Sequence, residues 1–189
     1  MENVPPLVWI IIGVVAFVLV WMATAYNSLI RLRNHCTESW ADIDTELKRR
    51  HDLVPNLVES VKGYATHERG VFEKVVAARN AAHATHASPA AQARDENALI
   101  GGIRQLMVVA EAYPDLKANQ NFLSLQQELS NTEDRIQRAR RFYNANVRDL
   151  NTRIDVIPSS LIANWFQFTK REYFEIEDAT VRAVPSVKL

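Results

Sequence analysis

A run of about 20 uncharged residues near the N-terminus constrains the fold of this 189-residue chain more than any other feature. The run reads LVWIIIGVVAFVLVWMATAY, from Leu7 to Tyr26. At about 1.5 Å per residue, an α-helix of that length crosses the roughly 30 Å hydrocarbon layer of a bilayer. We therefore predict one transmembrane helix at residues 7–26, whose membrane-spanning side chains include Leu7, Trp9, Ile12, Val15, Phe17, Leu19 and Trp21.

A cleaved signal peptide is the alternative interpretation, because residues 23–25 (Ala-Thr-Ala) resemble a small-residue cleavage site. Two features favour an uncleaved anchor: Glu2 and no basic residue precede the run, and the run exceeds the usual length of a signal-peptide core. Arg31 and Arg33 follow it closely. Because Lys and Arg are enriched on the cytoplasmic side, we expect residues 1–6 outside the membrane and the remainder in the cytoplasm.

Composition favours helices and argues against several function classes. Lys+Arg and Asp+Glu are both 22, so the formal net charge is zero and no overall field attracts nucleic acid. Cys36 is the only cysteine, which excludes an intramolecular disulfide and a cysteine-based zinc site. The five histidines show no metal-ligand spacing. We expect an all-α protein that binds no metal, cofactor or nucleic acid.

Apolar residues after the run recur at helical spacing, which predicts that the transmembrane helix continues into the following domain. Pro55 interrupts this pattern and predicts a kink near residues 50–52, or else the end of the helix. A kink is favoured because the periodicity resumes after the proline. The apolar face comprises Leu29, Leu32, Cys36, Trp40, Ile43, Leu47, Val54, Leu57, Val61 and Tyr64.

Three more helices are predicted, at residues 71–87, 90–112 and 116–157. Gly101 and Gly102 indicate a close approach between helices. The last helix carries a coiled-coil-like heptad with a stutter, at Phe122, Leu125, Leu129, Thr132, Ile136, Ala139 and Tyr143 and then at Val147, Leu150 and Ile154. Its charged residues from Glu133 to Arg141 are expected to face solvent. Residues 27–157 therefore predict an antiparallel, up-down-up-down bundle of long helices joined to the transmembrane helix.

The expected helix lengths leave part of this bundle uncovered. Outside the membrane span, the first and last helices are each about 60 Å long, while the middle two reach only about 30 Å. An apolar seam between residues 29–43 and 143–154 then needs a partner, either a second copy or the chain's own C-terminus.

The C-terminal segment, residues 158–189, is aromatic and amphipathic before a tail with few core-forming residues. One interpretation is an anchor at the membrane surface or a self-association surface. The other is that its aromatic side chains cap the core of the bundle. The residues in question are Leu161, Ile162, Trp165, Phe166, Phe168, Lys170 and Arg171.

Catalysis finds little support in the sequence. His51 and Asp52 are adjacent, so they point to different helix faces and form no ready acid–base pair. No nucleophile motif or phosphate loop accompanies them, and salt bridges across helices are the simpler role for this polar stretch. We therefore expect that this protein is not an enzyme. A partner-binding patch is the functional alternative, with Arg50, His51, Pro55, Tyr113, Asp115 and Lys117 as its candidate residues.

Five stretches of the sequence resemble the LemA family, and together they extend over almost the whole chain. They are YNSLIRLRN at residues 26–34, DIDTELKRRHDLVPNLVESVKGYA at 42–65, AEAYPDLKAN at 110–119, NTEDRIQRARRFYNANVRDLNTRI at 131–154 and PSSLIANWFQFTKREYF at 158–174. The resemblance implies an N-terminally anchored helical bundle in the bacterial inner membrane. It implies no enzymatic activity, but it suggests a link to membrane organisation, envelope stress or membrane proteases.

Two functions follow as hypotheses. The first is a self-assembling scaffold that organises the bacterial membrane or envelope, with lipid and copies of itself as partners. The alternative is an adaptor or regulator that presents its bundle to a membrane protease or another envelope complex.

Overall fold

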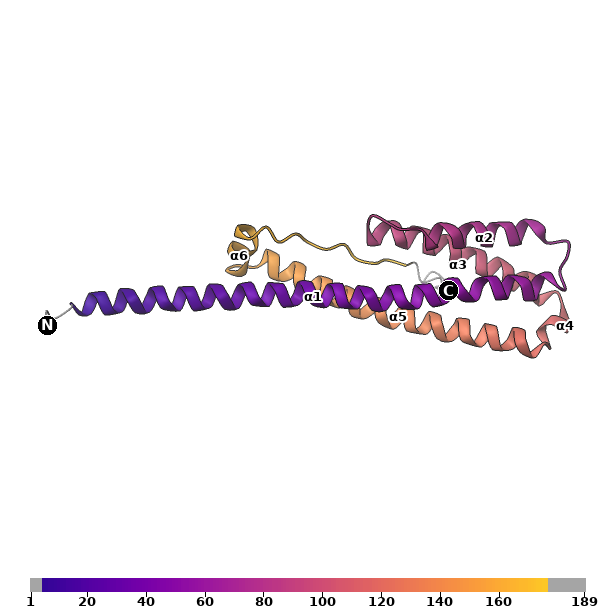
Figure 1. Cartoon of the computed structure of the whole chain (residues 1–189), viewed down its shortest axis with the longest axis horizontal. Helices are drawn as coiled ribbons and strands as arrows, with labels where there is room; N and C mark the ends of the chain where they lie inside the picture. The colour runs from indigo at the N-terminus through magenta and orange to yellow at the C-terminus, as the bar shows by residue number, and fades with distance from the viewer. Residues whose placement is uncertain (1–4, 177–189) are drawn as a thin grey trace, which may run out of the picture. The chain divides into compact units, whose positions relative to one another are not determined.

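A computed structural model describes residues 5–176 and contains six helices and no strand in that range (Figure 1). The all-α prediction is therefore confirmed for the described residues. The expectations for residues 1–4 and for the tail from residue 177 lie outside them. The helices are α1 (Pro6–Lys62), α2 (Arg69–His83), α3 (Pro89–Glu111), α4 (Pro114–Lys117), α5 (Gln120–Asp155) and α6 (Ser159–Trp165).

The chain divides into two compact units. Unit 1 comprises the chain up to Trp40 together with Phe142–Arg171, and unit 2 comprises Ala41–Arg141 and the chain from Glu172. Unit 1 therefore contains the apolar N-terminal run and α6. Unit 2 contains α2, α3 and α4.

α1 runs through Pro55 without a break, so the proline does not end the helix. Proline has no N–H group, which leaves the carbonyl of His51, one turn earlier, without its usual intrahelical donor. In unit 2, Nε of Arg79 on α2 donates to that carbonyl at 3.1 Å. The proline is tolerated because a neighbouring helix supplies the missing hydrogen bond.

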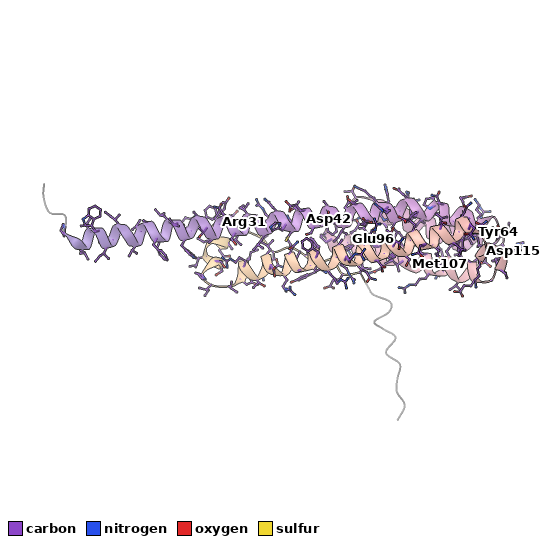
Figure 2. The ribbon with its side chains drawn as sticks, turned by 90° about the horizontal axis from the view of Figure 1, so that it is seen from below. Arg31, Asp42, Tyr64, Glu96, Met107 and Asp115 are labelled. Atoms are coloured by element: carbon purple, nitrogen blue, oxygen red, sulfur yellow. The ribbon has the colours of Figure 1, made fainter. Side chains whose placement is uncertain are left out.

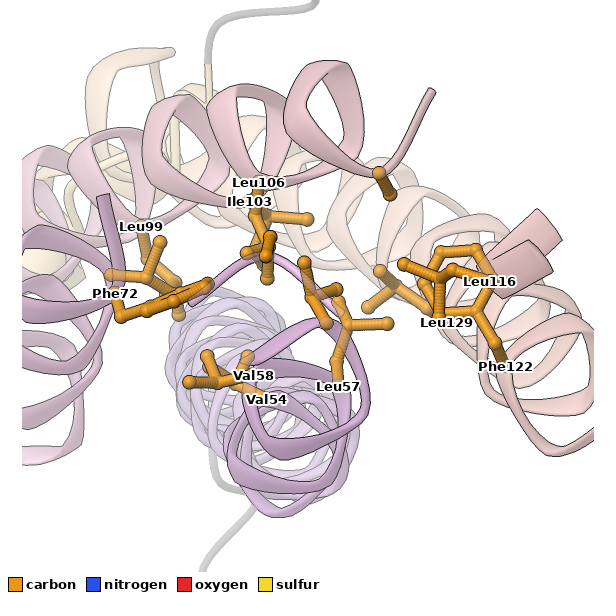
Figure 3. Packing of buried hydrophobic residues seen from close by; sticks show 14 of the residues in the cluster. Val54, Leu57, Val58, Phe72, Leu99, Ile103, Leu106, Leu116, Phe122 and Leu129 are labelled. Carbon is orange, nitrogen blue, oxygen red and sulfur yellow. The ribbon is translucent and has the colours of Figure 1, made fainter. Parts of the chain in front are cut away.

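The core of unit 2 combines part of the apolar face predicted for α1 with apolar side chains of α2, α3, α4 and α5 (Figure 3). Tyr64, which was predicted on that face of α1, is 41% exposed instead. α1 contributes Val54, Leu57, Val58 and Val61, α2 contributes Phe72 and Val75, α3 contributes Leu99, Ile103 and Leu106, and Leu116, Phe122 and Leu129 come from α4 and α5. All of these side chains are buried. Burial of apolar area on this scale is the main stabilising contribution to a helical unit.

The predicted helix at residues 116–157 is two helices in the structure, because Asn119 separates α4 from α5. Its side-chain Oδ1 accepts hydrogen bonds from the backbone N–H groups of Asn121 and Phe122, at 2.9 and 3.2 Å. This is an N-cap, which starts a new helix and satisfies donors that lack intrahelical partners.

The close approach predicted at the glycine pair occurs at Gly102 and not at Gly101. A Cβ atom at Gly102 would lie 3.3 Å from Cγ2 of Val75 on α2, whereas at Gly101 it would meet nothing within 4 Å. Gly102 therefore lets α3 pack closely on α2.

Gly101→Ala is expected to raise the free energy of unfolding by up to about 1 kcal/mol, because alanine has the higher helix propensity and the position is open. Gly102→Ala is expected to gain less, since Val75 must move to admit the new methyl group. Urea unfolding of the two full-length variants in detergent checks this. An equal gain at both positions contradicts the close contact.

In unit 1 the chain's own C-terminal segment packs on the seam between α1 and α5. The buried residues include Leu29 and Cys36 on α1, and Tyr143, Val147 and Leu150 on α5. Burial raises the pKa of the Cys36 thiol, which keeps this single cysteine protonated and unreactive.

Candidate functional site

Unit 2 holds a cluster of charged and polar side chains inside its core, which we call the buried charge cluster: Arg50, His51, Gln92, Glu96 and Glu133. Arg50 is fully buried on α1, and its guanidinium pairs with the buried carboxylate of Glu96 on α3. The same guanidinium donates from Nη1 to both carboxylate oxygens of Glu133 on α5, at 2.8 and 3.0 Å. One arginine therefore joins three helices by ion pairs.

Glu96 is the centre of the cluster and lies inside unit 2 (Figure 2). Its Oε1 lies 2.9 Å from Nε2 of His51 and accepts a 2.7 Å hydrogen bond from the side-chain amide of Gln92. The Gln92 amide also donates to the carbonyl of Ala82 at the end of α2. The Glu96 carboxylate is thus bound by side chains on α1 and on its own helix α3. The Gln92 amide also links this site to α2 through the carbonyl of Ala82.

Burial alone raises the pKa of the Glu96 carboxyl. The hydrogen bond with His51 and the positive charge of Arg50 oppose that effect and hold the pKa below its ordinary value of 4.5. Glu96 is therefore ionised at neutral pH in the folded chain, and its charge is balanced inside the core.

This lowered pKa predicts a loss of stability in acid. Because the folded pKa is below the unfolded one, Glu96 contributes stability above about pH 4.5, and that contribution falls as the pH drops through the folded value. The difference in unfolding free energy between the natural chain and Glu96→Gln should shrink below pH 4.5. Urea unfolding at a series of pH values measures it. A difference that stays constant from neutral pH into acid contradicts the assignment.

The cluster is suited to holding helices together. Arg50 and Glu96 are sealed from solvent, and His51 is almost fully buried, so a substrate has no access to them here. Asp52 is exposed while His51 faces inward, which confirms that these neighbours lie on different faces of α1. The predicted salt bridges across helices are present, with the charges inside unit 2 rather than on its surface.

The second candidate site is in unit 1, where the chain after α6 is extended. We call residues 166–171, the part of this segment that belongs to unit 1, the C-terminal strap. Phe166 and Phe168 place their rings 4.6 and 5.9 Å from the ring of Tyr26. The guanidinium of Arg33 lies 5.6 Å from the centre of the Phe168 ring, a cation–π contact.

Asn151 on α5 binds the backbone of the strap directly. Its side-chain amide donates to the carbonyl of Arg171, and its Oδ1 accepts from the N–H of the same residue, both at 2.9 Å. Arg171 also donates from Nη2 to Oγ1 of Thr37, and Lys170 pairs with Asp155 at 2.8 Å. The strap is therefore fixed to both α1 and α5 of unit 1.

α6 divides the predicted interfacial residues between two environments. Ile162 is buried with Ala163, whereas Leu161 is 63% exposed and Trp165 is 79% exposed. Ile157, just before α6, is 83% exposed. The segment thus covers its own unit on one side and presents large apolar groups on the other.

A third feature is a groove of about 660 Å³ between α1 and α2 in unit 2. Val58, Phe72, Val76 and Ala77 give it an apolar part, and both signs of charge are present along it. Its charged lining residues are Glu59, Lys62, Arg69 and Glu73. We call it the α1–α2 groove.

Comparison with known proteins places the chain in a family. The model of the LemA family matches residues 39–189, which is most of the sequence. The chain belongs to the LemA family. Magnetosome proteins MamQ 1 and MamQ 2 of Paramagnetospirillum magneticum are each 24% identical to it over 194 residues, covering 89% of this chain and 71% of theirs. Magnetosome protein MamQ of Magnetospirillum gryphiswaldense is 22% identical over 194 residues, again covering 89% of this chain and 71% of its own length.

The apolar run of this LemA-family chain lies on α1, and every side chain from Leu7 to Val20 is exposed. Among the described residues, α1 is the one helix long and apolar enough to cross a membrane, with a mean hydropathy of 2.6 in its most apolar window. Of the predicted spanning residues, Trp21 alone is half-buried. These features indicate a membrane protein.

The candidates for a partner-binding patch do not form one surface. Arg50 and His51 are buried in the charge cluster, so their side chains are not available to a partner in this structure. Pro55, Asp115 and Lys117 are exposed, and Tyr113 is half-buried. Tyr64 and Asp115 lie at one end of unit 2 (Figure 2), where the amide of Asn119 donates to the Tyr64 hydroxyl at 3.2 Å.

Sequence reasoning missed Glu96, Gln92 and Asn151 as site residues and placed Glu133 in solvent. Glu133 is only one-third exposed and pairs with Arg50, so its placement in a fully solvated face is corrected. A signal for Glu96 was present, because it lies three residues before Leu99 on the buried stripe of α3. No comparable spacing marks Asn151, whose role depends on the path of the strap.

Proposed function

We propose that this chain is a membrane-anchored, non-enzymatic scaffold that assembles with copies of itself in a bacterial inner membrane. The α1–α2 groove carries the proposal. It combines the exposed side chains of Val76 and Ala77 with two cations and two anions, Lys62 and Arg69 beside Glu59 and Glu73. A surface with both signs of charge can pair with its own copy by a two-fold operation. The zero net charge of the chain removes overall repulsion between copies.

Several other features support parts of the proposal. The apolar run on α1 supports the anchor, and Arg31 and Arg33 after it support an N-terminus outside and a cytoplasmic helical domain. The sealed charge cluster supports a non-enzymatic role. The short connections between α1, α2, α3 and α5 support the antiparallel, up-down-up-down arrangement. The likeness to magnetosome proteins of two bacteria supports a bacterial membrane setting.

Cysteine crosslinking in native membranes tests self-assembly through the groove. In a Cys36→Ala background, Ala77→Cys places a thiol in the α1–α2 groove, and Ser124→Cys places one at an exposed position of α5 outside it. We expect oxidation to give a disulfide-linked dimer for Ala77→Cys and none for Ser124→Cys. Equal crosslinking of both variants, or of neither, counts against the groove as the interface.

The adaptor is the second candidate, and the exposed residues Asp115 and Lys117 on α4 favour it. A photo-crosslinker at Lys117 in cells distinguishes the two functions. A membrane protease or another envelope protein trapped at this position supports the adaptor. Trapping of only copies of the same chain opposes it.

A further inference from the structure

The unpartnered apolar residues of unit 1, Ile157, Leu161 and Trp165, lie beside the end of the apolar run on α1. We call them the α6 surface. The run from Leu7 to Tyr26 has the length of the hydrocarbon layer, so Tyr26 marks the level at which a spanning α1 leaves it. Tyrosine is also one of the two residues enriched at that level. The position of α6 relative to Tyr26 therefore determines whether the α6 surface contacts the bilayer or water.

α6 is fixed at this level by its own contacts. Phe166 follows α6 directly, and its ring lies 4.6 Å from that of Tyr26. The strap then continues to Phe168, whose ring is 5.9 Å from Tyr26 and is covered by Arg33. The end of α6 is thus held against the residue at which the predicted span ends.

The side chains that face away from unit 1 suit a bilayer surface. Leu161 and Trp165 are four residues apart and share one exposed face of α6, whereas Ile162 and Ala163 are buried in the interior of the unit. Tryptophan and leucine on the outer face, at this level, are the groups that enter the boundary between headgroups and acyl chains. Arg31 and Arg33 are exposed one to two turns beyond Tyr26, where cations attract anionic headgroups.

We propose that α6 is a second membrane anchor, which lies in the interface of the bilayer that α1 crosses and inserts the α6 surface into it. The occupant of this surface is lipid rather than a second copy, because the surface is continuous with the apolar run through the Tyr26–Phe166 contact. Two attachment points restrain the tilt of unit 1 relative to the bilayer, which a single helix does less well. This inference rests on the membrane anchoring in the proposed function.

Depth-dependent fluorescence quenching tests the inference on the full-length chain. Single cysteines replace Leu161, Phe17 or Glu38 in a Cys36→Ala background and carry the environment-sensitive dye NBD. Leu161 and Phe17 are exposed, and Glu38 is exposed on α1 of the same unit about three turns beyond Tyr26. Vesicles of phosphatidylcholine and phosphatidylglycerol contain lipids with doxyl quenchers at shallow or deep acyl positions.

We expect a loss of fluorescence at Leu161 with shallow quenchers, at Phe17 with deep quenchers, and at Glu38 with neither. If Phe17 is quenched while Leu161 remains as bright as Glu38, the second anchor is wrong and the span stands. A Leu161→Cys disulfide between copies without lipid quenching also overturns it, because a second copy then occupies the surface. If the dye at Phe17 is not quenched by the deep quenchers, the membrane anchoring on which the inference depends is wrong.

Discussion

Glu96→Ala should lower the free energy of unfolding by about 3–5 kcal/mol, the largest effect we expect from a single substitution in this chain. The variant leaves the fully buried guanidinium of Arg50 without one of its two carboxylate partners. It also removes the hydrogen-bond partner of His51 in the core. Urea unfolding of the full-length chain in detergent, followed by circular dichroism, gives the change.

Two variants serve as controls for this prediction. Asp44→Ala removes an exposed ion pair with Lys48 and should cost less than about 0.5 kcal/mol. The double variant Arg50→Met with Glu96→Leu replaces the buried pair by apolar groups and should be far more stable than Glu96→Ala. If Glu96→Ala costs no more than Asp44→Ala, the charge cluster does not hold the helices of unit 2 together.

Leu106→Ala should lower the unfolding free energy by about 2–5 kcal/mol. Leu106 is fully buried on α3, in the core to which α1, α2 and α5 also contribute (Figure 3). Its truncation leaves a cavity, because the surrounding helices keep their other contacts and cannot close around the missing atoms. The same unfolding measurement applies.

The matched control is Leu123→Ala, which removes the same atoms from a leucine on α5 that is 41% exposed. A loss below about 1 kcal/mol is expected there, since little apolar area returns to water and the site stays open. Similar losses for the two leucines are incompatible with the packing in unit 2.

Helical periodicity predicted most of the buried face of α1 and α5. Leu29, Ile43 and Leu57 on α1, and Ile136 and Val147 on α5, are all buried as their spacing indicates. The start of α5 after Asn119 was not predicted, because the apolar pattern continues across this residue. Asparagine is a common N-cap, and the hydrogen bonds of the Asn119 side chain confirm that role.

The buried charge cluster was only partly predictable. Arg50 lies three residues after Leu47 and four before Val54, so the spacing alone places it on the buried face of α1. Arginine and glutamate are seldom fully buried unless they are paired, so the residue types alone predicted that Arg50 and Glu96 lie on the surface. Which carboxylates pair with Arg50 depends on the contacts between helices, which a single sequence does not specify.

The strap shows a different limit. Its aromatic and basic residues indicated contact with lipid or with the bundle, and in the structure Phe166 and Phe168 contact Tyr26 on α1. The position of the strap depends on an extended backbone whose N–H and carbonyl groups at Arg171 are hydrogen-bonded by the side chain of Asn151. Sequence patterns of helices and strands do not describe such a segment.

The mass of the full-length chain in native lipid particles, measured by light scattering, tests the central claim most directly. A self-assembling scaffold predicts a discrete particle whose protein mass is a multiple of the 21.5 kDa chain. Ala77→Glu, which puts a charge into the apolar part of the α1–α2 groove, should reduce that mass. A single 21.5 kDa chain per particle contradicts self-assembly and favours the adaptor.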